Sequence, residues 1–143
     1  MDRLLVAAVI VAAAAVVAVV IRSRRRTDAP TQPRATVPAQ LDRTDFPRPE
    51  AAWLVVVFTS ATCHTCADVA AKVAVLESDD VAVAEIEYGR DRGRQQRYGI
   101  DAVPAVVVAD VDGVVRRSFL GPVTATDLWA AVAWLREGAD PSC

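Results

Sequence analysis

Two cysteines and the only histidine of the chain stand together in the segment Thr62-Cys63-His64-Thr65-Cys66. A thiolate is the nucleophile of disulfide exchange, and cysteines separated by two residues lie about one helical turn apart, close enough to form an intramolecular disulfide. The spacing therefore predicts a redox-active pair formed by Cys63 and Cys66. Two other interpretations also fit an isolated C-x-x-C: half of a zinc site, or two small buried side chains without chemistry.

The residues around the pair predict a buried strand before it and a helix after it. Trp53 to Phe58 is an apolar run of mostly β-branched and aromatic residues, which is typical of a buried strand. After Cys66, Val69, Val73 and Leu76 recur at helical spacing. The cysteines would then stand where a helix begins, and the free N–H groups and the dipole of a helix N-terminus favour an anion such as the Cys63 thiolate. This context favours the redox interpretation.

A second segment, Tyr98 to Pro104, carries the other informative signal. Pro104 directly precedes the apolar run Ala105 to Ala109, and a proline, which has no N–H to donate, belongs at a strand start or in a cis turn. With this segment in place, the chain resembles the thioredoxin family from about Val37 to Trp134. The residues that carry the resemblance are Val55-Val56-Val57-Phe58, the Cys63/Cys66 motif, Tyr98-Gly99-Ile100, Val103-Pro104, Asp112-Gly113 and Gly121.

The resemblance implies an α/β fold of the thioredoxin type, with a mixed sheet flanked by helices. Val37 to Phe46 is expected to supply the first edge strand, and the usual first helix is reduced to Pro49 to Ala52. The remaining expected elements are a strand over 81–87, a short polar helix over 91–98, a hairpin turn at Asp112-Gly113, an edge strand over 115–120 and a last helix capped by Thr124.

The resemblance also implies roles for the site residues. Cys63 would be exposed and attack a substrate disulfide, and the more buried Cys66 would resolve the mixed disulfide. Pro104 resembles the cis-proline of the family and would lie opposite the cysteines, where the Val103 backbone would pair with an extended substrate segment. Thr62 would also face the substrate, although the family commonly has tryptophan there.

A further departure concerns the proton of Cys66. Many thioredoxins carry a buried aspartate at the position of Val57. Without that carboxylate, proton transfer to or from Cys66 must go through water or through Glu85. This predicts a slower or more specialised exchanger than a general reductant.

His64 has two interpretations. It is either an exposed residue without a role, or a partly cationic imidazole that stabilises the Cys63 thiolate and makes the disulfide more oxidising. Oxidising relatives usually carry a histidine just before the second cysteine, whereas His64 directly follows the first.

The N-terminal part predicts a membrane anchor. Residues 4–21 are an unbroken apolar stretch, long enough as a helix to span roughly 27 Å. Arginines at positions 22 and 24–26 follow it, whereas a secretory signal has its positive charge before the apolar region. We therefore expect a single transmembrane helix rather than a cleaved signal or a buried helix. The positive-inside rule predicts a soluble domain that faces the cytoplasm, with an extracytoplasmic position as the alternative.

The predicted parts are a transmembrane anchor with its basic flank (1–26), a Pro-rich linker (27–36) and a thioredoxin-like domain (37–143).

The expected partners are proteins that carry a dithiol or a disulfide, an unidentified reductase or oxidant, and the membrane through residues 4–21. Nothing in the sequence indicates a nucleotide, flavin or metal cofactor. Nucleic acid is not expected, because Arg92, Arg94 and Arg97 have no interleaved aromatic residues for stacking on bases. The alternative function is a non-catalytic adaptor that binds partners at the Val103-Pro104 groove.

The third cysteine, Cys143, is the last residue of the sequence. Its simplest interpretation is an idle exposed thiol, and the alternative is a resolving cysteine or a mixed-disulfide site. A zinc site made of Cys63, His64, Cys66 and Cys143 is disfavoured, because adjacent residues such as Cys63 and His64 converge poorly with Cys66 on one tetrahedral ion.

Overall fold

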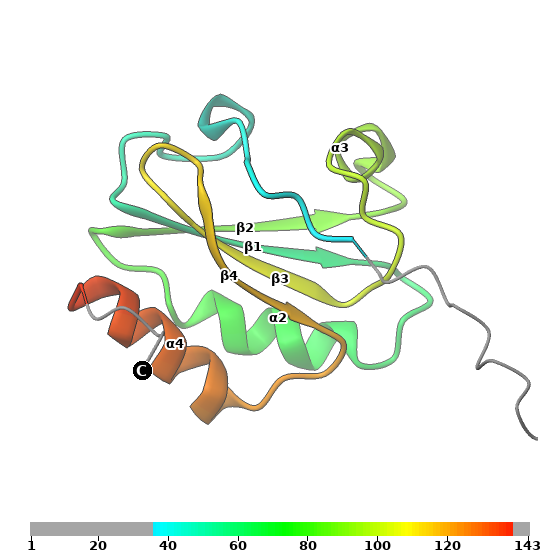
Figure 1. Cartoon of the computed structure of the whole chain (residues 1–143). Helices are drawn as coiled ribbons and strands as arrows, with labels where there is room; N and C mark the ends of the chain where they lie inside the picture. Colours follow the sequence, from blue (N-terminus) through cyan, green and yellow to red (C-terminus); the bar gives the residue numbers. More distant parts are fainter. Residues whose placement is uncertain (1–35, 139–143) are drawn as a thin grey trace, which may run out of the picture. The chain divides into compact units, whose positions relative to one another are not determined.

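The computed structural model describes residues 36–138 (Figure 1). Its sheet has the strand order β2-β1-β3-β4, in which β1 is parallel to β2 and antiparallel to β3, and β4 is antiparallel to β3. The strands are β1 (Trp53–Thr59), β2 (Val81–Glu87), β3 (Ala105–Asp110) and β4 (Val115–Leu120). The helices are the 3-10 helix η1 (Arg43–Asp45) and the α-helices α2 (Cys66–Ala74), α3 (Arg92–Arg97) and α4 (Ala125–Arg136). This is the mixed sheet flanked by helices that the sequence predicts.

The sheet has an apolar core on each of its faces, because side chains alternate along a strand. Helices α2 and α4 cover one face. Helix α3 and the N-terminal segment, which here means the chain from Val37 to Phe46, lie over the other (Figure 1). On the first face, valines of β1 and β3 pack against Val69, Val73, Leu128 and Val132. On the second, Leu54, Val56 and Phe58 pack with Leu41, Phe46 and Tyr98. A strand buried on both faces must be apolar at nearly every position, which explains the unbroken run in β1.

The N-terminal segment differs from its predicted structure. Val37 to Phe46 does not form an edge strand: Gln40 makes one isolated bridge to Val114, and the 3-10 helix η1 follows. Pro38, which cannot donate to a ladder, and the Asp42 carboxylate, which accepts the Thr44 N–H at 3.0 Å, favour a turn here over a strand. The helix expected over Pro49 to Ala52 is absent as well, and this stretch forms turns and bends.

Two arginines hold this segment to the sheet in place of strand pairing. The buried guanidinium of Arg43 donates to the carbonyls of Asp110, Arg48 and Ala51. Arg48 has a φ of 48°, a left-handed conformation that non-glycine residues seldom adopt, and its guanidinium donates to the carbonyls of Ser78 and Val81. Arg48 therefore covers the start of the outer edge of β2.

None of the helices in residues 36–138 is long and apolar enough to cross a membrane. The anchor predicted for residues 4–21, its arginine flank and nearly all of the predicted linker lie outside the described range, as does Cys143.

Tyr98 joins the end of α3 to the N-terminal segment. Its hydroxyl accepts a hydrogen bond from the Asp42 N–H at 3.1 Å and donates one to the Asp45 carboxylate. Arg97 forms ion pairs with both aspartates. Burial, together with the Asp45 carboxylate, raises the pKa of Tyr98 to about 12. The cluster therefore depends on a neutral phenol.

We predict an alkaline loss of stability that depends on Tyr98. The pKa of Tyr98 is about 12 in the fold, whereas its ordinary value is 10.0. The stabilisation of the fold by the neutral Tyr98 phenol is therefore complete below pH 10 and is lost as the pH rises through 12. A rise of that size corresponds to about 2 to 3 kcal/mol of unfolding free energy. Urea unfolding of the disulfide-bonded protein should show this loss in the wild type and in Tyr88→Phe, whose tyrosine is exposed, but not in Tyr98→Phe. An equal alkaline loss in Tyr98→Phe would contradict the assignment.

Candidate active site

Cys63 and Cys66 form a disulfide, with their Cα atoms 5.4 Å apart. The pair lies in the connection between the end of β1 and the start of α2. Two successive turns bring the sulfurs together: the Cys63 N–H donates to the Ser60 carbonyl at 3.0 Å, and the Cys66 N–H donates to the Cys63 carbonyl at 3.3 Å. The closeness predicted from the spacing is therefore present in the fold.

The two cysteines differ in exposure. Cys66 is only 2% exposed, whereas Cys63 is partly exposed. Thr62, His64 and Thr65 around it are exposed, and the Thr62 hydroxyl lies 3.1 Å from that of Ser60. An approaching group thus meets Cys63 before Cys66.

The helix begins later than the sequence suggested. Helix α2 starts at Cys66, with Thr65 at the N-cap position but without a side-chain cap, so Cys63 lies in the turn before the helix. The Thr65 hydroxyl lies 3.7 Å from the Cys63 sulfur, within hydrogen-bonding range for sulfur. Sequence reasoning gave Thr65 no role, and the only available signal was a hydroxyl residue two positions after a cysteine.

The Val103-Pro104 segment lies at the same end of the sheet as the cysteine turn. Phe58, near the end of β1, pairs with Ala105, which directly follows Pro104. The Val103-Pro104 peptide bond is cis, Pro104 is buried and Val103 is partly exposed. The Pro104 carbonyl accepts the Gly121 N–H at 2.8 Å, which ties this loop to the end of β4. The cysteine turn and the Val103-Pro104 loop therefore lie side by side at the same end of the sheet.

Polar side chains fix the strand ends beneath the cysteine turn. The side-chain amide of Gln95, which is 2% exposed, donates to the carbonyls of Thr59 and Ile86 at 2.8 Å each. The Glu87 carboxylate accepts the N–H groups of Gly89 and Ala61, at 2.9 and 3.1 Å. These backbone N–H groups, that of Gly89 first, lower the pKa of Glu87. Sequence analysis missed both residues, because each acts on a segment distant in the chain.

Glu85, the carboxylate named from the sequence as a route for the Cys66 proton, lies opposite the buried Val57 in the β1–β2 pair. Its carboxylate accepts a hydrogen bond from the Thr59 hydroxyl at 2.9 Å. Within residues 36–138, no hydrogen bond joins it to Cys66. Glu85 is therefore close to the strand that carries the cysteine turn, without direct contact to the sulfur.

No group of three or more histidine, cysteine or acidic side chains suited to a metal ion occurs in the described part of the chain. Among these residues, His64, Cys63 and Cys66 therefore do not make up such a group.

A mixed sheet covered by helices on both faces, with a disulfide after a central strand and a cis-proline loop beside it, is a thioredoxin-like fold. Comparison with solved structures agrees. A mutant thioredoxin from Halobacterium salinarum NRC-1 is similar, with a TM-score of 0.55 and 24% sequence identity over 67% of this chain and 84% of that one. Thioredoxin from Malassezia sympodialis (Mala s 13) gives a TM-score of 0.49 and 20% identity over 57% of this chain and 73% of that one. No family model matches the chain, and no curated protein does.

We predict that Gln95→Met lowers the unfolding free energy by about 1 to 2 kcal/mol, because a buried amide that bridges two strand ends is lost. Gln96→Met is the matched control, since the neighbouring Gln96 is exposed, and it should change stability by less than about 0.5 kcal/mol. Urea unfolding of the oxidised proteins measures both values. Equal stabilities of the two variants would show that the bridge does not support the strand ends.

Proposed function

We propose that this protein exchanges thiols and disulfides with protein substrates through Cys63 and Cys66. The observation that carries the proposal is the asymmetric disulfide: one sulfur is partly exposed and the other is buried, at the end of β1 and beside the Val103-Pro104 loop. The thioredoxin-like fold supports the same chemistry.

The exchange proceeds in two balanced steps. In the reduced protein, the Cys63 thiolate attacks a substrate disulfide, so that a Cys63–substrate disulfide forms and one substrate sulfur leaves and takes up a proton. Cys66 then loses its proton and attacks the Cys63 sulfur, which forms the Cys63–Cys66 disulfide and releases the second substrate thiol. Two electrons and two protons pass to the substrate. A thiol reductant must restore the reduced pair, and the reverse sequence oxidises a substrate dithiol.

Binding of the substrate is assigned to the surface around the exposed sulfur. The Val103 backbone, beside Pro104, would pair with an extended segment of the substrate, and Thr62 would contact the same segment across Cys63. Because Val57 supplies no carboxylate, the Cys66 proton leaves through water or toward Glu85, which lies on the strand next to β1.

The cellular position of the domain stays a prediction from the sequence. It rests on the apolar stretch 4–21 and the arginines that follow, which favour a membrane tether with the domain in the cytoplasm.

Serine variants test the proposal, in a Cys143→Ser background that removes the third thiol. Reduced wild-type protein should reduce the disulfides of insulin, used as a generic substrate. Cys63→Ser should abolish this activity, and Cys66→Ser should accumulate a mixed disulfide at Cys63, since the resolving thiol is missing. Thiol release and mass spectrometry measure the two outcomes. Partner-dependent function that survives replacement of both cysteines would support the adaptor alternative instead.

For His64 we predict that replacement by glutamine lowers the reduction potential of the pair, because a partly protonated imidazole next to Cys63 stabilises the reduced thiolate. The expected change is about 15 to 30 mV, a three- to tenfold change in the equilibrium constant. Equilibration with glutathione buffers measures the potential. An unchanged or higher reduction potential would contradict a role for His64 in stabilising the Cys63 thiolate.

A further inference from the structure

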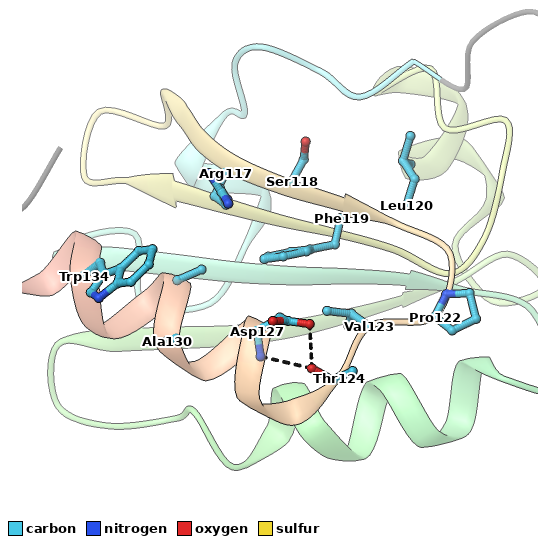
Figure 2. Close-up of a pocket in the computed structure, with 11 residues that line it drawn as sticks. Arg117, Ser118, Phe119, Leu120, Pro122, Val123, Thr124, Asp127, Ala130 and Trp134 are labelled. Atoms are coloured by element: carbon cyan, nitrogen blue, oxygen red, sulfur yellow. Dashed lines mark hydrogen bonds between the residues drawn. The ribbon is translucent and has the colours of Figure 1, made fainter. Parts of the chain in front are cut away.

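A groove of about 570 Å³ runs between strand β4 and helix α4. Figure 2 shows Phe119 in its middle, with Trp134 and Arg117 at one end and Pro122 at the other. Asp127 on α4 is already engaged in the helix cap, where its carboxylate accepts the Thr124 hydroxyl at 2.7 Å. A second hollow, of about 420 Å³, follows β4 from Val115 to Phe119. The hollowed surface therefore extends along the whole strand.

The outer edge of β4 carries free backbone groups along this surface. In an antiparallel pair, every second residue directs its N–H and C=O to the neighbouring strand. Because Gly121 donates to the Pro104 carbonyl, the register directs the backbone groups of Phe119 and Arg117 to β3 and those of Ser118 and Leu120 outward. In residues 36–138, nothing pairs with this edge beyond the bridge between Gln40 and Val114.

One end of the groove is linked to the Pro104 loop through Gly121. Its lining at one end includes Leu120 and Pro122, which flank Gly121, and Gly121 is bonded to the Pro104 loop. The end of β4 and the Pro104 loop therefore lie side by side.

The side chains of the groove define what would fill it. Trp134 is 52% exposed and Leu120 is 46% exposed, so both present apolar surface to a ligand. The guanidinium of Arg117 lies 5.9 Å from the centre of the Phe119 ring and forms no ion pair within the described part of the chain. The groove thus offers apolar contacts, one available positive charge and a strand edge.

We propose that this groove binds an extended segment of the protein substrate, which adds to β4 as a further strand. The inference rests on the proposed exchange function and extends it by giving the site a second contact region. Free N–H and C=O groups on a strand edge match the backbone of another extended chain, and pockets along the edge select side chains. The preferred segment has an apolar residue for Trp134 and an acidic residue for Arg117.

A second copy of this chain fits the edge less well. Arg116 is paired with Asp110, but antiparallel pairing of two β4 strands would bring two copies of Arg117 into one short ladder, and like charges across a ladder are destabilising. The substrate is therefore the occupant that the charges favour.

The test compares two peptide disulfides with the full-length reduced protein in a Cys143→Ser background, so that only Cys63 and Cys66 can react. Each has one terminal cysteine bearing a thionitrobenzoate leaving group. The short peptide has about four residues, and the long one has about 12 residues of alternating apolar and polar type with one aspartate, enough at roughly 3.3 Å per residue to run along β4. In single turnovers without further substitution, the second-order rate constant for the long peptide should exceed that for the short one by about tenfold, because the long peptide binds more tightly.

Trp134→Ala should remove this advantage and leave the rate with the short peptide unchanged. Trp129→Ala is the matched control, because Trp129 is a similarly exposed tryptophan of α4 outside the groove lining, and it should keep the advantage. No length dependence in the wild type, or equal behaviour of the two tryptophan variants, would overturn the proposal. A dimer that forms with rising concentration and is lost in Trp134→Ala would overturn it in favour of a second copy.

Amide hydrogen exchange separates this proposal from the proposed function. A cysteine-free form of the long peptide, added in excess to oxidised protein, should slow exchange at Ser118 and Leu120 but not at Arg117 and Phe119, which are already bonded to β3. If neither peptide disulfide reacts with the wild type, the exchange function fails, and protection at Ser118 and Leu120 still decides whether the groove binds a strand. Absent protection overturns the groove proposal even if both disulfides react.

Discussion

The burial of strand β1 on both faces is the constraint on which the rest of the domain depends. Its residues from Leu54 to Thr59 are all buried, so the strand can end only where the chain reaches the surface. That point is the turn that carries Cys63. The apolar core thereby fixes the position of a polar, reactive segment that contributes little to packing itself.

The strand ends beneath this turn are held by polar groups rather than by apolar contacts. Gln95 closes the ends of β1 and β2, the Glu87 carboxylate binds the N–H of Ala61, and the Thr59 hydroxyl is bonded to Glu85. Buried backbone groups need such partners when a ladder stops. The same hydrogen bonds hold the start of the turn that carries Cys63, whereas the residues next to Cys63 are exposed.

Much of this arrangement could be read from the sequence, because local patterns determine it. The strand over 81–87 and the edge strand over 115–120 have the predicted bounds, and the Thr124 cap of α4 is present, with its hydroxyl accepting the Asp127 N–H. The N-terminal segment was predicted wrongly, because a buried arginine replaces strand pairing there. Gln95 was missed for a related reason: its partners lie 9 and 36 positions away, and no periodicity connects them.

The two outer strands of the sheet differ in a way that limits how the molecule can assemble. Arg48 occupies carbonyls at the start of the free edge of β2, and Glu85 and Glu87 add negative charge along that strand. Such features discourage pairing with another chain, whereas nothing in residues 36–138 gives β4 a comparable cover over Ser118 and Leu120. Indefinite edge-to-edge growth needs two receptive edges on every unit. With one receptive edge per unit among the described strands, copies of the domain cannot stack edge to edge without limit.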